Sequence, residues 1–264
     1  MALKLIFSEV KNPFYASIRL IFQSSPYTIR IRRDNAVISG DRSLILEKLM
    51  ETYLKRVTPN RTYVWQYKKK AYHINGYNSS ATIFSTFIFQ DWNKLNVRGR
   101  TVLDIGGYIG DTAIYFAAKG ANRVIVYEAF PYSYKIAKEN IIQNNLSDIV
   151  EVNNCALGGK NSFITIDPNY INDNESKVVA FSGGIKISVI TLKDIVEKYN
   201  IIDGCLKMNC EGCEYEVFDN TDVETLQKFS EIYMHYHASK SPLIKKLKLA
   251  GFKVKVDDYI YAVQ

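Results

Sequence analysis

An acidic residue and three glycines follow an apolar segment near the middle of the chain. Residues 101–116 read TVLDIGGYIGDTAIYF, which predicts a strand ending near Asp104, a glycine turn and a helix. Gly106, Gly107 and Gly110 permit a tight turn and a close approach of the backbone to a bound molecule. The pattern predicts a nucleotide-type ligand at the carboxyl end of this strand.

The spacing of the turn, D-x-G-x-x-x-G, narrows the choice of nucleotide. A dinucleotide fingerprint needs G-x-G-x-x-G, and Tyr108 stands in the place of its second glycine. A phosphate-binding P-loop needs Gly-Lys followed by Ser or Thr, and the sequence has no such tripeptide. The remaining candidate is the turn of S-adenosylmethionine (SAM) enzymes, with Asp104 near the cationic methionyl part. A purely structural turn is the alternative.

A second carboxylate strengthens the nucleoside interpretation. Glu128 ends the next apolar segment, 18 residues after Gly110. A carboxylate at this place can accept hydrogen bonds from both ribose hydroxyls of a nucleoside, whereas it would repel a phosphate. Spacing and charge together therefore predict an adenosine with free hydroxyls.

Two histidines and two glutamates are the candidates for acid-base chemistry. The methyl group of SAM is already activated, so an enzyme must mainly align an acceptor and remove its proton. His235 and His237 share one strand parity, and histidine alone has an unperturbed pKa suited to this task near neutral pH. We therefore expect one of these two histidines to be the base, with a pKa near 6 to 7. Glu211 or Glu214 is the competing base.

Four cysteines, Cys155, Cys205, Cys210 and Cys213, are too few for a secreted disulfide framework and suggest a reducing compartment. Cys210 and Cys213 form a C-x-x-C motif. No second such pair completes a zinc site, and the motif does not follow the first strand as it does in thioredoxins. We therefore expect packing thiols and no metal.

Short apolar segments alternate with helical ones from residue 101 onward. Strands are expected at residues 102–105, 124–127, 149–152, 206–208, 232–236 and 252–256. Helices are expected at residues 112–119, 132–144, 192–199, 223–229 and 243–250. This alternation predicts an α/β fold with a doubly wound, mostly parallel, seven-stranded Rossmann-like sheet that ends in an antiparallel hairpin at residues 253–263. Residues 162–190 are expected to form an inserted hairpin with a mobile loop at 168–184.

The first part of the chain differs from the rest in charge. The net charge is +7, and residues 1–100 contain 17 Lys and Arg against 6 Asp and Glu. We expect residues 1–95 to form a small mixed α/β appendage and residues 96–264 the main domain. Within the appendage a strand at 27–32, a helix at 44–55 and a hairpin of 63–67 with 71–74 are expected. The excess of positive charge indicates an anionic partner such as nucleic acid, or a solvated basic face.

The sequence predicts no membrane span. The longest uncharged run, residues 71–90, contains seven Asn, Ser and Thr residues that hydrocarbon would leave unpaired. Glu9 and Lys11 interrupt the apolar residues near the N-terminus, which argues against a secretion signal. A cytoplasmic location is the expectation.

Three stretches resemble the FkbM family of SAM-dependent methyltransferases over about residues 89–256. They are the segment 102–141 around the glycine turn, TLKDIVEKYNIIDGCLKMNCEGCEYEV, and YMHYH followed by LIKKLKLAGFKV. The resemblance implies a class I Rossmann-like fold and methyl transfer, usually to oxygen on a sugar, lipid-linked or natural-product substrate. It implies that Asp104, Gly106, Gly110 and Glu128 contact SAM, with Asn154 as a candidate at the adenine. Further candidate cofactor contacts are Gly107, Asp111 and Asn209.

The resemblance also implies that Glu211, Gly212 and Glu214 form the acid-Gly-x-acid turn at the mouth of the active site. Asn209 departs from the family pattern, in which many members have aspartate. An amide cannot act as a general base, so we expect the task to pass to His237, with His235 and Glu211 orienting the acceptor or tuning the imidazole.

The first functional hypothesis is O-methylation of a glycan, lipid-linked or other small hydroxylated substrate. The second is RNA (tRNA or rRNA) methylation, in which the basic N-terminal segment follows the phosphates. The third, suggested by Asn209, is a SAM-binding module that has lost catalysis. The sequence does not choose among acceptors.

Overall fold

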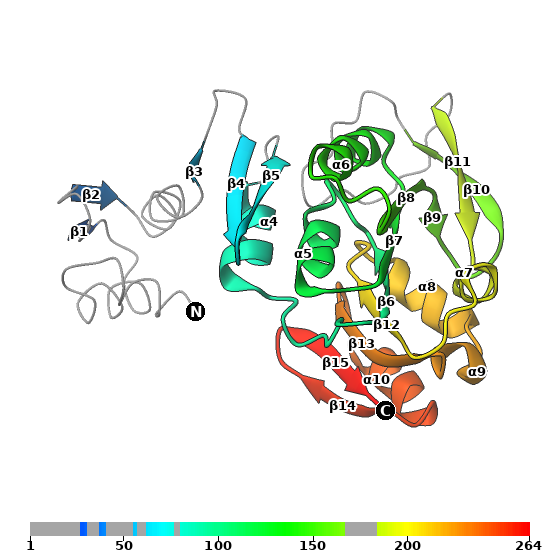
Figure 1. The fold of residues 1–264 in the computed structure, drawn as a ribbon. Helices are drawn as coiled ribbons and strands as arrows, with labels where there is room; N and C mark the ends of the chain where they lie inside the picture. Colours follow the sequence, from blue (N-terminus) through cyan, green and yellow to red (C-terminus); the bar gives the residue numbers. More distant parts are fainter. Residues whose placement is uncertain (1–26, 31–36, 41–54, 57–61, 77–79, 167–183) are drawn as a thin grey trace. The chain divides into compact units, whose positions relative to one another are not determined.

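The computed structural model describes residues 27–30, 37–40, 55–56, 62–76, 80–166 and 184–264. The chain divides into two compact units, Met1–Gln90 and Asp91–Gln264 (Figure 1). The second unit begins before residue 96, since Trp92 packs edge-on against Tyr233 and Tyr259 with ring centroids 5.5 and 5.3 Å apart. The expected loop at 168–184 and helix at 44–55 lie outside the described residues, apart from the last residue of each.

The described part of the first unit contains two small antiparallel sheets. One pairs β1 (Tyr27–Arg30) with β2 (Val37–Gly40), and the other has the order β3-β4-β5. The expected hairpin at the lysines is confirmed, because β4 and β5 pair in antiparallel register around Lys68 and Lys69. The remaining elements are β3 (Lys55–Arg56), β4 (Thr62–Tyr67), β5 (Lys70–Asn75), the helix α4 (Ser80–Ile83) and the π-helix η1 (Phe84–Phe89).

The second unit is built on a seven-stranded sheet with the order β14-β15-β13-β12-β6-β7-β8. The five neighbouring strands from β13 to β8 pair in parallel, and β15 alone runs in the opposite direction, between β13 and β14. This confirms the predicted sheet and its closing hairpin. The strand order reverses between β6 and β12, and ligands bind at such switch points in open α/β sheets. The strands are β6 (Thr101–Ile105), β7 (Arg123–Glu128), β8 (Val150–Asn154), β12 (Gly204–Met208), β13 (Phe229–His235), β14 (Lys253–Val256) and β15 (Tyr259–Val263).

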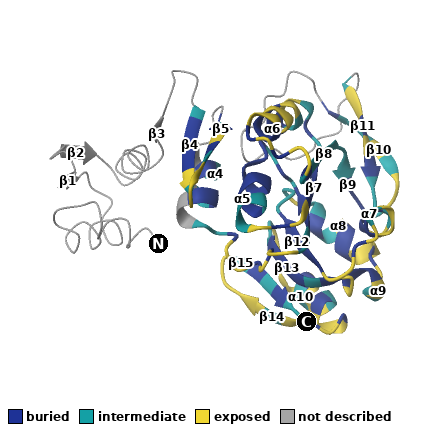
Figure 2. Cartoon of the chain, viewed as in Figure 1, coloured by how far each residue is buried: buried dark blue, intermediate teal, exposed yellow. Residues whose placement is uncertain are grey.

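Helices cover both faces of this sheet (Figure 1). On one face α7, α8, α9 and α10 share a buried core with the strands, including the fully buried Leu206, Phe229 and Leu247. Figure 2 shows that the central strands of the sheet are buried, whereas the edge strand β14 is largely exposed. The helices are α5 (Asp111–Lys119), α6 (Pro131–Gln143), α7 (Leu192–Tyr199), α8 (Cys213–Asn220), α9 (Val223–Leu226) and α10 (Ser241–Leu249).

Two helix expectations need correction. The helix expected at 223–229 ends at Leu226, because Phe229 already begins β13. Helix α8 is not among the helices expected from the sequence. Thr191 caps the start of α7, since the Asp194 amide donates to the Thr191 hydroxyl at 3.1 Å.

The predicted inserted hairpin is present. Strands β10 (Ser162–Ile166) and β11 (Ile185–Ile190) pair in antiparallel register, and β11 also pairs in parallel with β9 (Ala156–Leu157). None of the helices in the described part of the chain is long and apolar enough to cross a membrane.

Candidate active site

The glycine turn after β6 lies tightly against the end of β12. Gly106 has φ +71°, and a Cβ atom there would be 1.9 Å from the backbone oxygen of Asn209. The Gly106 amide donates to the Tyr127 carbonyl at 2.9 Å, which joins the turn to β7 as well. Glycine is therefore required at this position by backbone packing, and the turn sits where the ends of three strands meet.

Asp104 is fully buried beneath this turn, and both of its carboxylate oxygens have partners. The Lys207 ammonium lies 2.8 Å from Oδ1, and the Thr112 hydroxyl donates to Oδ2 at 2.5 Å. Lys207 is itself 2% exposed and also donates to the carbonyl of Gly106 at 2.7 Å. The carboxylate therefore anchors the turn from below. Sequence reasoning missed Lys207, although a lysine within a buried apolar strand requires a buried partner.

Glu128 lies at the carboxyl end of β7 and supports the turn from the side. Its Oε2 accepts from the Tyr108 amide at 2.8 Å, and its Oε1 accepts from the Phe130 amide at 2.9 Å. Burial raises the pKa of Glu128 to about 7, against the opposing effect of these two amides. The carboxylate has further acceptor capacity for ribose hydroxyls, because each oxygen has two lone pairs.

The other predicted cofactor contacts surround the same edge of the sheet. Asn154 donates from its side-chain amide to the Glu128 carbonyl at 2.9 Å and so positions the end of β7. Gly110 precedes α5 with φ +79°, and Asp111 is the buried first residue of that helix. Asn209 donates its amide to the Ile105 carbonyl at 3.0 Å. Its side-chain oxygen is a buried acceptor with no hydrogen-bond partner in the described part of the chain.

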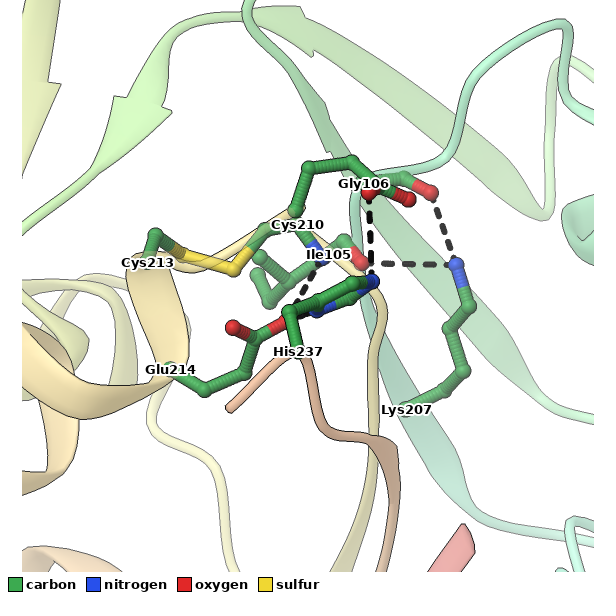
Figure 3. The surroundings of a disulfide bond; sticks show 8 residues. Ile105, Gly106, Lys207, Cys210, Cys213, Glu214 and His237 are labelled. Carbon is green, nitrogen blue, oxygen red and sulfur yellow. Dashed lines mark hydrogen bonds and ion pairs between the residues drawn. A yellow bond between two sulfur atoms is a disulfide. The ribbon is translucent and has the colours of Figure 1, made fainter. Parts of the chain in front are cut away.

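The predicted acid-base residues form one cluster at the ends of β12 and β13, and Figure 3 shows Glu214 beside His237. His237 Nδ1 lies 3.1 Å from Glu214 Oε1, and His237 Nε2 lies 3.2 Å from Glu211 Oε2. His235 Nδ1 is 3.1 Å from the same Nε2 atom. Glu214 is fully buried, whereas the Glu211 side chain is 25% exposed. Of the two carboxylates, Glu211 is therefore the one that an acceptor can reach.

The protonation of this cluster differs from the expectation. Burial alone would lower the pKa of His237, but its hydrogen bonds to Glu211 and Glu214 outweigh burial and raise the pKa to about 9. The expected value of 6 to 7 was wrong because both ring nitrogens face carboxylates. The pKa of His235 is lowered by burial and by its charged neighbour His237. Near neutral pH, His237 is an imidazolium and His235 is neutral.

The turn between β12 and α8 has an unusual backbone. Glu211 has φ +57° and Gly212 has φ +113°, so two successive residues are left-handed. Such a conformation in a non-glycine residue costs about 1 to 2 kcal/mol and is often found at functional sites. Tyr215 on α8 accepts a 2.6 Å hydrogen bond from the Ala238 amide and so fixes the segment after His237.

Cys210 and Cys213 form a disulfide, which corrects the expectation of packing thiols. The two left-handed residues bring the Cα atoms within 5.5 Å of each other, a distance that a disulfide can bridge. Cys155 and Cys205 are free. No group of three or more His, Cys, Asp or Glu among the described residues could hold a metal ion.

The strand order, the glycine turn at the switch point and the acid after the second parallel strand define a Rossmann-like, nucleoside-binding α/β enzyme. A family model described as the methyltransferase FkbM domain matches residues 104–254, more than half of the chain. The chain therefore belongs to the FkbM family of SAM-dependent methyltransferases, and SAM is its methyl donor.

The individual proteins that resemble this chain match it only in part. A putative protein N5-glutamine methyltransferase of Methanocaldococcus jannaschii is 33% identical over 104 residues, which are 35% of this chain and 51% of that protein. The chain thus matches about half the length of this relative. Methyltransferase FkbM of Methylobacillus flagellatus is 19% identical with a TM-score of 0.48, over 68% of this chain and 47% of that one. TrmK of M. capricolum, crystallised with S-adenosyl-homocysteine, is 13% identical with a TM-score of 0.42, over 67% and 66%.

Proposed function

We propose that this chain transfers the methyl group of SAM to a hydroxyl oxygen of a glycan, lipid-linked or other small acceptor in the cytoplasm. The supporting observation is the cluster of Glu211, Glu214, His235 and His237 at the carboxyl ends of β12 and β13, next to the cofactor turn. A hydroxyl acceptor must lose a proton during methyl transfer, and this cluster offers a partly exposed carboxylate that can take it.

Within this proposal Glu211 accepts the proton and His237 is a positioning residue. Both ring nitrogens of His237 face carboxylates and its pKa is about 9, so it has no lone pair to offer near neutral pH. Its positive charge instead holds the Glu211 carboxylate in place through the 3.2 Å contact. This assignment exchanges the expected roles of His237 and Glu211.

Two features of the cofactor pocket fit SAM. Glu128 presents a carboxylate with a pKa of about 7, which in its ionised form can accept hydrogen bonds from the ribose hydroxyls. Asn209 Oδ1 is a buried acceptor that suits the ammonium of the methionyl part. SAM, when bound, supplies an activated methyl group, and the protein aligns the acceptor and removes its proton.

We predict that binding of S-adenosylhomocysteine is linked to the ionisation of Glu128. Ribose hydroxyls donate to the ionised carboxylate, so affinity should rise about tenfold between pH 6 and pH 8 as a group of pKa about 7 loses its proton. Glu128→Gln should remove this pH dependence and weaken binding at pH 8 by about 10- to 150-fold, the equivalent of hydrogen bonds to a charged group. Titration calorimetry measures both effects.

The exposed Glu139→Gln on α6 is the matched control and should behave as the wild type. Wild-type affinity that does not change between pH 6 and pH 8 would contradict the role of Glu128. Tight binding of NAD, with no binding of S-adenosylhomocysteine, would contradict the assignment of SAM as the cofactor.

The acceptor can be identified by incubating cell lysate with this chain and methyl-labelled SAM, followed by untargeted mass spectrometry. We expect label on an oxygen of a small or lipid-linked molecule, with a rate that varies little between 50 and 200 mM salt. Label on RNA, with a loss of affinity of about 10³- to 10⁵-fold over this range, would instead favour RNA methylation through the basic N-terminal segment.

Two further outcomes would overturn the proposal. Label on a glutamine side chain would favour protein methylation, the activity in the name of the M. jannaschii relative. No labelled product under any condition would favour a SAM-binding module without catalysis.

A further inference from the structure

The disulfide between Cys210 and Cys213 closes a ring around the residue that we assign as the proton acceptor. The ring contains four residues, and Glu211 and Gly212 are the two between the sulfur-bearing positions. Cys210 follows Asn209 at the end of β12, and Cys213 is the first residue of α8. Figure 3 shows the disulfide beside Glu214 and His237. The covalent ring therefore lies within the active site itself.

The ring also holds the conformation on which the acid-base cluster depends. The left-handed backbone of Glu211 and Gly212 brings the two cysteines together, and the disulfide in turn opposes relaxation of these residues. The amide of Cys210 donates to Glu214 Oε1 at 3.1 Å, the same oxygen that faces His237. A change at Cys210 thus reaches Glu211 through the chain and Glu214 through a hydrogen bond.

The chemistry of these two sulfurs differs from that of the other cysteines. Cys213 begins a helix of eight residues, and thiolates are stabilised at helix N-termini and in C-x-x-C motifs. Both sulfur-bearing residues are half-buried, so a small dithiol can reach them. Burial raises the pKa of Cys205 to about 11 and also raises the pKa of Cys155. Thiol exchange should therefore be confined to the active-site pair.

We propose that Cys210 and Cys213 form a reversible redox site that regulates methyl transfer. In the oxidised form the ring holds Glu211 against His237. A dithiol reductant transfers two electrons and two protons: the Cys210–Cys213 bond breaks, two S–H groups form, and the reductant becomes a disulfide. The freed turn relaxes, Glu211 leaves His237, and methyl transfer slows. Disulfides of cytosolic proteins are usually of this transient, redox-sensing kind. The inference rests on the proposed role of Glu211.

The first test follows His237 directly and needs no acceptor. The chain has three histidines, so imidazole signals can be followed by NMR as pH is varied. In the oxidised protein His237 should titrate near pH 9, and after treatment with dithiothreitol its pKa should fall by at least one unit because one carboxylate has moved away. Alkylation in denaturant should count two thiols before reduction and four after it.

The second test measures methyl transfer to the acceptor found by labelling. Reduction should lower the rate at least tenfold, and re-oxidation with diamide should restore it, while the affinity for S-adenosylhomocysteine stays within threefold. A Cys210→Ser, Cys213→Ser double variant should have the low rate under all conditions. The matched control, Cys155→Ser, should respond to reduction as the wild type does.

Two results would overturn the redox site: an unchanged pKa of His237 on reduction, or a double serine variant with full activity. Failure of the proposed function is seen separately, in the oxidised protein. If Glu211→Gln keeps full activity there, Glu211 is not the proton acceptor. If that variant is inactive while reduction has no effect, only the redox inference fails.

Discussion

Glu211→Gln should lower kcat by about 10²- to 10⁴-fold, the usual contribution of a positioned general base, and should leave the affinity for S-adenosylhomocysteine within about threefold. Glutamine keeps the size of the side chain and can still contact His237, but it cannot accept a proton. We expect kcat to change without the cofactor affinity because the two depend on different residues. Glu211 lies at the β12–α8 turn, whereas Glu128, the carboxylate assigned to the ribose, lies at the end of β7. Single-turnover kinetics and calorimetry measure them. The exposed Glu197→Gln on α7 is the matched control and should change neither value.

The pH profile reports the role of His237. Its pKa in the folded protein is about 9, above the unfolded value of about 6.5, so the folded state binds the proton more tightly. The stabilising contacts with Glu211 and Glu214 are complete below pH 6.5 and are lost as pH rises through about 9. We therefore expect kcat to fall above about pH 9, where the charge that holds Glu211 disappears. A neutral histidine base of pKa 6 to 7 would instead cause the rate to fall on the acid side.

The alternative assignment makes the opposite prediction for the variants. If His237→Ala abolishes the reaction while Glu211→Gln remains within about threefold of the wild type, the imidazole is the base. If neither change matters, the acceptor needs no base, as for an amine or an already ionised group. In that case O-methylation loses its main support.

Local patterns predicted most of the second unit from sequence. The helices expected at 132–144 and 192–199 are present as α6 and α7, and the expected parallel strands also agree with the structure. Each of these signals depends on residues close in the chain. Helix α8 was missed because its buried face consists of Glu214, Val217 and Phe218. A buried acid at the first of these positions interrupts the apolar spacing of the helix. Its burial is explained by the contact with His237, which follows β13.

The chemistry of the site was less predictable, because it depends on contacts between distant residues. The C-x-x-C motif is compatible with free thiols, metal ligands or a disulfide. The disulfide forms because Glu211 and Gly212 are left-handed, and the apolar periodicity of the sequence does not predict this conformation. The pKa of His237 depends on carboxylates 23 and 26 residues earlier in the chain. In the sequence, Lys207 is a charged residue within an otherwise apolar strand. Its partner Asp104 can be identified only from the structure, in which β6 pairs with β12.

Lys207→Met should lower the free energy of unfolding by about 3 to 5 kcal/mol, the usual effect of removing one partner of a buried ion pair. Lys207 is 2% exposed and Asp104 is fully buried, so water cannot replace the lost ammonium. The variant also loses the 2.7 Å hydrogen bond to the Gly106 carbonyl and the contact of the ammonium with the Trp92 ring at 5.1 Å. Equilibrium denaturation in urea measures the change, and Lys228→Met at an exposed position should stay within about 0.5 kcal/mol of the wild type.

The double variant Asp104→Asn, Lys207→Met tests whether the unpaired charge causes this loss. An asparagine can keep the hydrogen bond from Thr112 without leaving a buried charge. Buried ion pairs replaced on both sides are often nearly neutral in stability, so the double variant should be more stable than Lys207→Met alone. Strictly additive losses would show that the two side chains act independently, in contradiction to their 2.8 Å contact. The pair can be needed for stability, for the conformation of the glycine turn, or for both, and the double variant distinguishes these roles by its stability and its affinity for S-adenosylhomocysteine. If the double variant is stable but binds S-adenosylhomocysteine weakly, the fold tolerates loss of the pair. The glycine turn, no longer tied to Lys207, then does not keep its binding conformation.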